Sequence, residues 1–330
     1  MRFVVHAPAL NGDDGILDRL DRLVDRLADE VHRVEIVDVE SLQRSKWYQQ
    51  ARQTRRKVLM AAVARPPRRR ERNLGPHAKR VDVFDAGSVV SADKLAHTPL
   101  AILVEDRESD GVFLDILVEE LGWPELRALW QNGKAVTPRA VEITTAGGKS
   151  AVPARIERMV GDASEENRPL RVFVLCDSDS RWPGDHRPET TRVTDSCTKH
   201  GIPHHILRKR CIENYIPDSV IEEVRSDPRN KSNTARFDAL LGRSREQRDH
   251  FPVTDGLTPG ECAAAMSAGL YQSSEEADLK LLEAPLFRRR PRPLLLLGQE
   301  RRESFSADGL QARDGEGEMT SLLEAIAQEL

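Results

Sequence analysis

Four short strand-like runs, separated by stretches with helical character, constrain the fold of this chain more than any other feature. The runs are Leu100–Val104, Ala140–Thr145, Leu170–Cys176 and His204–Leu207. A wholly apolar run such as Leu100–Val104 is typical of a strand buried on both faces, and strands that alternate with helices indicate a parallel sheet. We therefore predict an α/β domain over residues 98–217, with a parallel sheet flanked by helices. After Pro217 the strand signal fades, and residues 218–330 are expected to be mostly helical.

The preceding residues, 1–97, predict a small α/β unit. Arg2–His6 and Val34–Val39 have the composition of strands, and apolar residues at helical spacing between them predict an amphipathic helix. A single basic helix is expected from Glu40 to about Val63. Pro66-Pro67 must end it, because proline lacks the N–H donor and disfavours a helical residue before it.

Basic residues are concentrated in one segment of a chain whose formal net charge is −4. Between Arg52 and Arg80 there are eleven Lys and Arg residues and one acid, Glu71. Such a run is often a solvated linker. Its contrast with the rest of the chain favours contact with the phosphates of a nucleic acid, with Arg68, Arg69 and Arg70 as the candidate residues.

The cysteines and the hydropathy pattern predict a cytoplasmic protein with no membrane contact. Four cysteines occur, at 176, 197, 211 and 262, without the spacing of a zinc site. That scatter favours a reducing compartment. The longest apolar run, Pro293–Leu297, is far shorter than the ~20 residues that span a bilayer. No signal peptide is evident after Met1.

Acidic side chains follow two of the predicted strands, where ligands gather in an open α/β sheet. Glu105 and Asp110 come after Leu100–Val104, ahead of a helix expected from Val112 to Leu121, and Asp177 and Asp179 come after Leu170–Cys176. Residues two apart in an extended segment face the same side, so Asp177 and Asp179 are expected to converge. Carboxylate oxygens suit Mg²⁺ or Mn²⁺, and a cation would relieve the repulsion among the acids.

Two of these segments carry a resemblance to a known family. The sequences LVED (Leu103–Asp106) and LCDSDS (Leu175–Ser180) are similar to the Glu and DxD motifs of TOPRIM domains, and most of all to nucleases related to the overcoming-lysogenization-defect family. Between them, AGGKS (Ala146–Ser150) resembles the family's glycine-rich turn. RKRCIENYIP (Arg208–Pro217) resembles the segment that supplies a further acid, here Glu213. The resemblance covers about 120 residues.

This resemblance implies a divalent-metal-dependent nuclease that cleaves DNA or RNA, including tRNA. It implies a role as an antiphage effector and a separate ATPase as partner. The implied catalytic residues are Glu105, Asp177, Asp179 and Glu213, and Asp110 joins them as a ligand of two Mg²⁺ or Mn²⁺ ions. Such ions act ~3.5–4 Å apart on an attacking water and a leaving oxygen.

The chain departs from the family pattern at two places. Asp106 follows Glu105 where the family has glycine, which leaves Glu108 as a reserve for the ligand assigned to Asp110. The stretch that matches the family's lysine region, QRDHFPVTDGL, contains no lysine, and Lys149 or Lys231 are the candidates for charge stabilisation. Lys149 is also the expected phosphate contact within the glycine-rich turn.

Two other functions stay open. A regulatory or scaffolding subunit with a degenerate TOPRIM site would share the same motifs. A haloacid-dehalogenase-type phosphatase also has a DxD after an apolar strand, with the first Asp as nucleophile. Hydrolysis of a nucleotide by this chain is not expected, because Ile143 stands where a phosphate-binding loop needs its first glycine.

Overall fold

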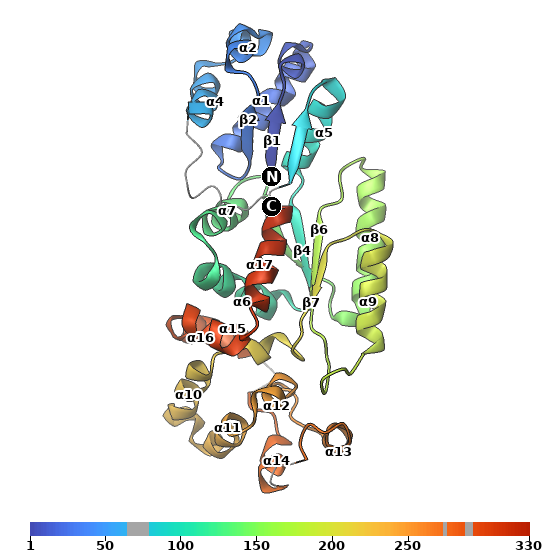
Figure 1. Cartoon of the computed structure of the whole chain (residues 1–330), viewed down its shortest axis with the longest axis vertical. Helices are drawn as coiled ribbons and strands as arrows, with labels where there is room; N and C mark the ends of the chain where they lie inside the picture. The colour runs from blue at the N-terminus through green and yellow to red at the C-terminus, as the bar shows by residue number, and fades with distance from the viewer. Residues whose placement is uncertain (65–78, 273–275, 288–292) are drawn as a thin grey trace.

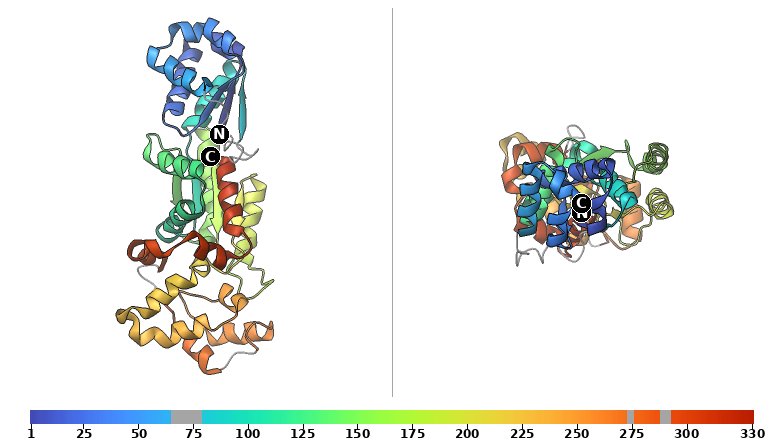
Figure 2. Two further views of the ribbon diagram at one scale, coloured as in Figure 1. Left: turned by 60° about the vertical axis from the view of Figure 1, so that its left-hand side comes forward. Right: turned by 90° about the horizontal axis from the view of Figure 1, so that it is seen from above.

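The computed structural model describes residues 1–64, 79–272, 276–287 and 293–330. Its parts are stacked along one long axis, as Figure 1 shows: a three-stranded sheet with its helices, then a four-stranded sheet with its helices, then a group of helices. The two ends of the chain lie side by side where the first two parts meet, and the views of Figure 2 agree. The predicted α/β class is confirmed.

The four-stranded sheet is parallel throughout and has the order β5-β4-β6-β7. Its strands are β4 (Leu100–Val104), β5 (Val141–Thr145), β6 (Val172–Cys176) and β7 (His204–Ile206). Ile102 pairs with Ile143 on one side and with Phe173 on the other. Every residue of β6 is buried. The wholly apolar runs are therefore the two central strands, as predicted.

Helices cover both faces of this sheet (Figure 1). One face packs on α6 (Arg107–Leu121), α7 (Pro124–Ala135) and α17 (Glu318–Glu329), and the other on α8 (Val152–Glu165) and α9 (Pro188–Lys199). Side chains alternate between the two cores along each strand: Ile102 and Val104 belong to the first, and Leu103 to the second. The sheet is thus held rigidly from both sides, which fixes the positions of its strand ends.

The N-terminal unit contains a second parallel sheet of order β2-β1-β3. Its strands are β1 (Arg2–Val5), β2 (Arg33–Ile36) and β3 (Arg80–Val83), and its helical elements include η1 (Ala7–Asn11), α1 (Asp14–Ala28) and α5 (Ala86–His97). The apolar stripe of α1 is buried as its spacing predicts, with Leu20 and Leu23 in the core. Helix α5, which packs on α1, was not predicted.

The prediction of a single basic helix from Glu40 to Val63 is wrong. The segment forms three helices, α2 (Val39–Arg44), α3 (Lys46–Gln50) and α4 (Gln53–Ala64). The first break is at Ser45, whose hydroxyl donates to the Leu42 carbonyl (2.6 Å) and accepts from the Tyr48 amide (3.2 Å). A serine that caps the next helix ends the previous one. The turn places Trp47 in the core, where its indole N–H donates to Asp21.

Beyond Pro217 every described element is helical, in agreement with the sequence. These are α10 (Asp218–Ser226), η5 (Pro228–Asn233), α11 (Thr234–Leu241), α12 (Arg245–Asp249), α13 (Pro259–Ser267), α14 (Glu276–Leu282), α15 (Pro293–Glu300), η6 (Arg302–Ser304), α16 (Ala307–Asp314) and α17. Helices α12, α15 and α16 were not predicted individually. Over the described ranges, none of the helices has the length and apolarity needed to cross a membrane.

Candidate metal centre

A cleft of about 500 Å³ opens at the carboxyl ends of β4, β5 and β6. Its lining comes from the start of α6, the turn after β5, the residue after β6, and the short helix η4 (Ile212–Tyr215). Six acids line it: Glu105, Asp106, Glu108, Asp110, Asp177 and Glu213. The predicted acids Glu105, Asp110, Asp177 and Glu213 are therefore brought together, although Glu213 lies more than 100 residues from Glu105 in sequence.

Glu105 and Asp177 are held by backbone amides at the ends of neighbouring strands. The Asp177 N–H donates to Glu105 Oε1 (3.0 Å), and the Ile212 N–H donates to Asp177 Oδ1 (3.0 Å). Burial is the main cause that raises the pKa of both carboxyls, and for Asp177 the neighbouring charges of Glu105 and Asp110 raise it further. Each carboxylate is thus held in one orientation by a backbone amide. Its negative charge is nevertheless less stable in the cleft than it would be in water.

Asp110 lies in the first turn of α6, not in a loop before it. The helix predicted from Val112 begins at Arg107, because the Asp106 side chain accepts the Glu108 amide (2.9 Å) as its N-cap. Asp110 accepts the Asp106 N–H (2.9 Å) and the Ser109 hydroxyl (2.9 Å). Burial raises its pKa to about 7, and Glu213 and Glu105 add to that rise.

Glu213 is only 6 % exposed and enters the cleft from η4. Asn214 fixes this turn: its Oδ1 accepts the Cys211 N–H (2.9 Å), and its amide group donates to the Arg248 (2.7 Å) and Phe251 (2.9 Å) carbonyls. The turn therefore depends on contacts to the C-terminal helices. Burial also raises the pKa of the neighbouring Cys211 thiol, which argues against a thiolate ligand.

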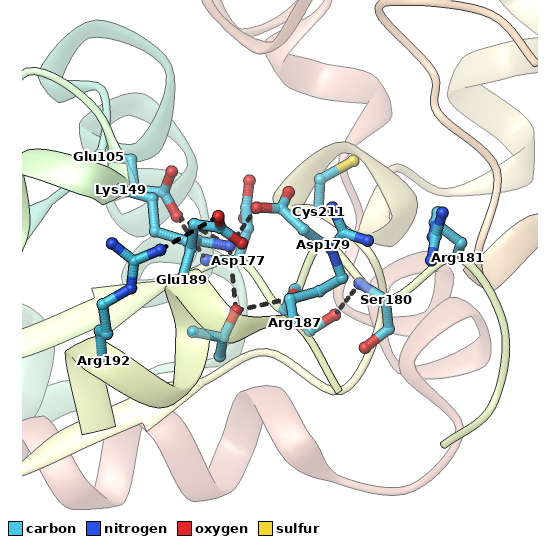
Figure 3. Close-up of polar contacts among 12 residues, drawn as sticks. Glu105, Lys149, Asp177, Asp179, Ser180, Arg181, Arg187, Glu189, Arg192 and Cys211 are labelled. Carbon is cyan, nitrogen blue, oxygen red and sulfur yellow. Dashed lines mark hydrogen bonds and ion pairs between the residues drawn. The ribbon is translucent and has the colours of Figure 1, made fainter. Parts of the chain in front are cut away.

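Asp179 does not face the cleft beside Asp177. Its backbone has φ of 57°, so the extended geometry expected for this pair fails at the second aspartate. Its N–H donates to the Arg210 carbonyl (2.8 Å), and its carboxylate accepts from the Lys149 ammonium (Figure 3). The same ammonium lies 3.7 Å from Glu105 Oε1 and 3.5 Å from Thr190 Oγ1. Asp179 thus joins the cluster through Lys149.

Lys149 is 7 % exposed, in η3 (Lys149–Ala151) directly after the glycine-rich turn. Burial alone would lower its pKa, but the charges of Glu105 and Asp179 raise it above the usual value. Lys149 is not among the residues that line the cleft, and neither is the other candidate, Lys231 in η5. The predicted phosphate contact of Lys149 stays a prediction. Arg68, Arg69 and Arg70 lie outside the described residues.

His250 of the C-terminal region, together with Lys209 and Thr190, supports the DxD loop, and none of the three was among the site residues predicted from the sequence. His250 Nδ1 lies 2.9 Å from the Ser180 carbonyl oxygen, and the Ser178 hydroxyl donates to the Lys209 carbonyl (2.7 Å). Thr190, in α9, donates to the Ser178 carbonyl (2.9 Å). The only signal available from sequence was the His250 position within QRDHFPVTDGL, already compared with the family.

As they stand, no three His, Cys, Asp or Glu side chains of the described ranges are gathered closely enough to hold a metal ion. The donor set nevertheless fits a hard divalent cation, since it consists of carboxylates whose buried charges repel one another. The Lys149 ammonium lies beside this set, 3.7 Å from Glu105 Oε1.

No protein-family model, curated protein or solved structure matches this chain.

Proposed function

We propose that this chain is a TOPRIM-type, divalent-metal-dependent nuclease that hydrolyses phosphodiester bonds of DNA or RNA. One observation carries the proposal: Glu105, Asp110, Asp177 and Glu213 line a single cleft at the carboxyl edge of a parallel sheet. Without a cation the charged form of these carboxylates is unfavourable there, because burial raises their pKa. Clusters of perturbed groups in a cleft are typical of functional sites.

Glu105 and Asp177 would hold a cation from the strand ends, and Asp110 and Glu213 from α6 and η4. When bound, Mg²⁺ or Mn²⁺ would supply an activated water and counter-charge for the leaving oxygen. The protein's own groups orient these ligands: the Asp177 amide fixes Glu105, and the Ile212 amide fixes Asp177.

The glycine-rich turn beside the cleft suits the approach of a sugar-phosphate backbone. Gly147 and Gly148 have φ of 83° and 110°, and a Cβ at either would meet nothing within 4 Å. A backbone turn with open space beside it lets a polymer approach the acids closely. Arg107, exposed at the start of α6, also lines the cleft and would attract the phosphates.

The two alternatives are less well supported. A phosphatase of this type would use Asp177 as its nucleophile, whereas Asp177 Oδ1 already accepts the Ile212 N–H and Asp179, the second acid of the DxD motif, does not line the cleft. A degenerate scaffold would not need four acids from four separate elements in one cleft. The role as an antiphage effector and the ATPase partner rest on the family resemblance alone.

The test is cleavage of plasmid DNA and of total tRNA by the purified chain, with Mg²⁺, Mn²⁺ or EDTA. We expect divalent-dependent cleavage of at least one substrate and its loss, by 100-fold or more, in Asp177→Asn. This variant preserves the size of the side chain. Glu157→Gln is the matched control, because this acid lies on α8 and pairs with Lys199 and His200 away from the cleft.

Cleavage that persists in EDTA, or that Asp177→Asn leaves at the wild-type rate, would remove the basis of the nuclease proposal. Loss of activity in Glu157→Gln as well would point to a general effect on folding, which circular dichroism of each variant checks directly.

A further inference from the structure

Lys149 is a buried cation that contacts Asp179 and lies close to Glu105, one of the acids that the proposed reaction needs. It projects from η3, between the glycine-rich turn and α8, and is held on three sides (Figure 3). Its ammonium donates to Asp179 and lies 3.7 Å from Glu105 Oε1 and 3.5 Å from Thr190 Oγ1. With 7 % exposure, it has little access to water.

The Lys149 ammonium and the Glu105 carboxylate each need a counter-charge in this setting. A buried ammonium is strongly destabilising without a counter-charge, and so is a buried carboxylate. Glu105 is 19 % exposed and Asp179 is 47 % exposed, so Glu105 depends more on the lysine. The Lys149 ammonium therefore supplies the positive charge that a divalent cation would bring to the same carboxylate.

We propose that Lys149 is the resident counterion of the acidic cluster in the metal-free protein, and that a divalent cation displaces its ammonium from Glu105 and Asp179. This inference rests on the metal site of the proposed function, not on cleavage. Its consequence is a linkage: the metal must compete with Lys149, and the released ammonium becomes available to a phosphate group in the cleft.

The first measurement is the affinity for Mn²⁺, by titration calorimetry on the full chain. In Lys149→Met we expect Mn²⁺ to bind about tenfold more tightly or better, because the competing charge within a few ångström is gone. Lys149→Arg keeps the charge and is expected to bind within about threefold of wild type. Lys134→Met is the control: its ammonium pairs with Asp115 (2.7 Å) away from the cleft, and its loss should leave the affinity unchanged.

The second measurement uses the wild-type chain and does not depend on any variant. Amine acylation followed by mass spectrometry reports how accessible the Lys149 ammonium is. We expect its labelling to rise several-fold when saturating Mn²⁺ is added, while that of Lys134 stays constant. In EDTA, Lys149→Met should also melt at a lower temperature than wild type, because Glu105 has lost its counter-charge.

Unchanged or weaker Mn²⁺ binding in Lys149→Met, or Lys149 labelling that Mn²⁺ leaves constant or lowers, would overturn the displacement. Absence of Mn²⁺ binding in both wild type and Lys149→Met would overturn it as well. A chain that shows both effects but cleaves no nucleic acid would retain the counterion exchange and lose the proposed nuclease function, so the two failures are distinct.

Discussion

Two opposing effects act on the carboxylate of Asp110: hydrogen bonds stabilise its charge, and burial destabilises it. Its oxygens accept hydrogen bonds from the Asp106 amide and the Ser109 hydroxyl, yet burial raises its pKa to about 7. Hydrogen bonds that favour the charged form are therefore outweighed by the loss of water around it. At neutral pH the charge of Asp110 destabilises the metal-free protein, and a ligand role gives a reason for its presence.

Asp110→Asn should stabilise the metal-free chain. The asparagine oxygen can accept the Asp106 N–H and its amide group can donate to the Ser109 oxygen, while the buried charge is removed. We expect a gain of about 1–3 kcal/mol in EDTA at pH 8, seen as a melting temperature several degrees higher. The stabilisation that Mn²⁺ gives to wild type should be largely lost. A lower melting temperature in EDTA would mean that the Asp110 charge is needed for folding.

The candidate acids could be predicted from the sequence, but the contacts and backbone conformation around each of them could not. Glu105 and Asp177 could be predicted because they directly follow apolar strands, and strand ends meet at one edge of a parallel sheet. The inward position of Lys149 and the left-handed backbone at Asp179 could not. Both depend on contacts distant in sequence, such as the Arg210 carbonyl that accepts the Asp179 amide.

Among the elements, α17 carries a buried acid, Glu318, which joins it to β7 and to the segment that follows β7. This residue is 2 % exposed and accepts from the Arg208 N–H (2.8 Å) and the Tyr215 hydroxyl, with His205 Nε2 at 2.9 Å. Burial tends to raise its pKa, but the hydrogen bonds from His205 and Tyr215 more than offset this and hold the pKa below the usual value of a glutamate. The segment that it holds continues into η4, which carries Glu213.

Glu318→Gln is expected to destabilise the fold by about 2–3 kcal/mol at pH 7. The NH2 group of the glutamine would face hydrogen-bond donors, which the carboxylate oxygens of Glu318 accept from. A carboxyl with a lowered pKa stabilises the folded state above its unfolded pKa, and this contribution is lost as pH falls through the folded value. The difference between wild type and Glu318→Gln should therefore shrink as pH falls below about 4.5. Urea denaturation at pH 7 and pH 4 measures it.

The control for this prediction is Glu316→Gln. Glu316 pairs with Arg208 and is 70 % exposed, so its loss should cost little at either pH. Equal destabilisation by Glu318→Gln at both pH values would contradict the assignment of Glu318 as the charged acceptor.

Helix patterns were predictable where an apolar stripe was long, as in α1, and failed where a local side chain decides. Ser45 divides the predicted basic helix by capping its second part, and Asp106 starts α6 earlier than its apolar residues indicate. Both are capping effects of one polar side chain. Helix α16 has no clear apolar stripe: only Leu310 among its apolar side chains is fully buried, together with Arg313 and Asp314.

At the scale of the whole molecule, the N-terminal unit and the four-stranded sheet meet around Arg171, just before β6. This side chain is 8 % exposed and donates to the carbonyls of Thr98 (2.7 Å) and Glu329, so it ties the link after α5 to the end of α17. Lys94 adds a second bond across the same boundary, to the Asn167 carbonyl (2.7 Å). The boundary lies at the amino end of β6, whereas the cleft lies at its carboxyl end.

Arg171→Met should therefore loosen the junction without altering the cleft. The methionine fills part of the volume but leaves two buried carbonyls without their donor, which costs about 1–3 kcal/mol. We expect faster proteolysis near Thr98 and unchanged Mn²⁺ affinity. Arg168→Met is the control, because Arg168 pairs with Glu166 at the surface three residues earlier. Unchanged protection near Thr98 would show that other contacts hold the junction, and weaker Mn²⁺ binding would show that the junction and the cleft are coupled through β6.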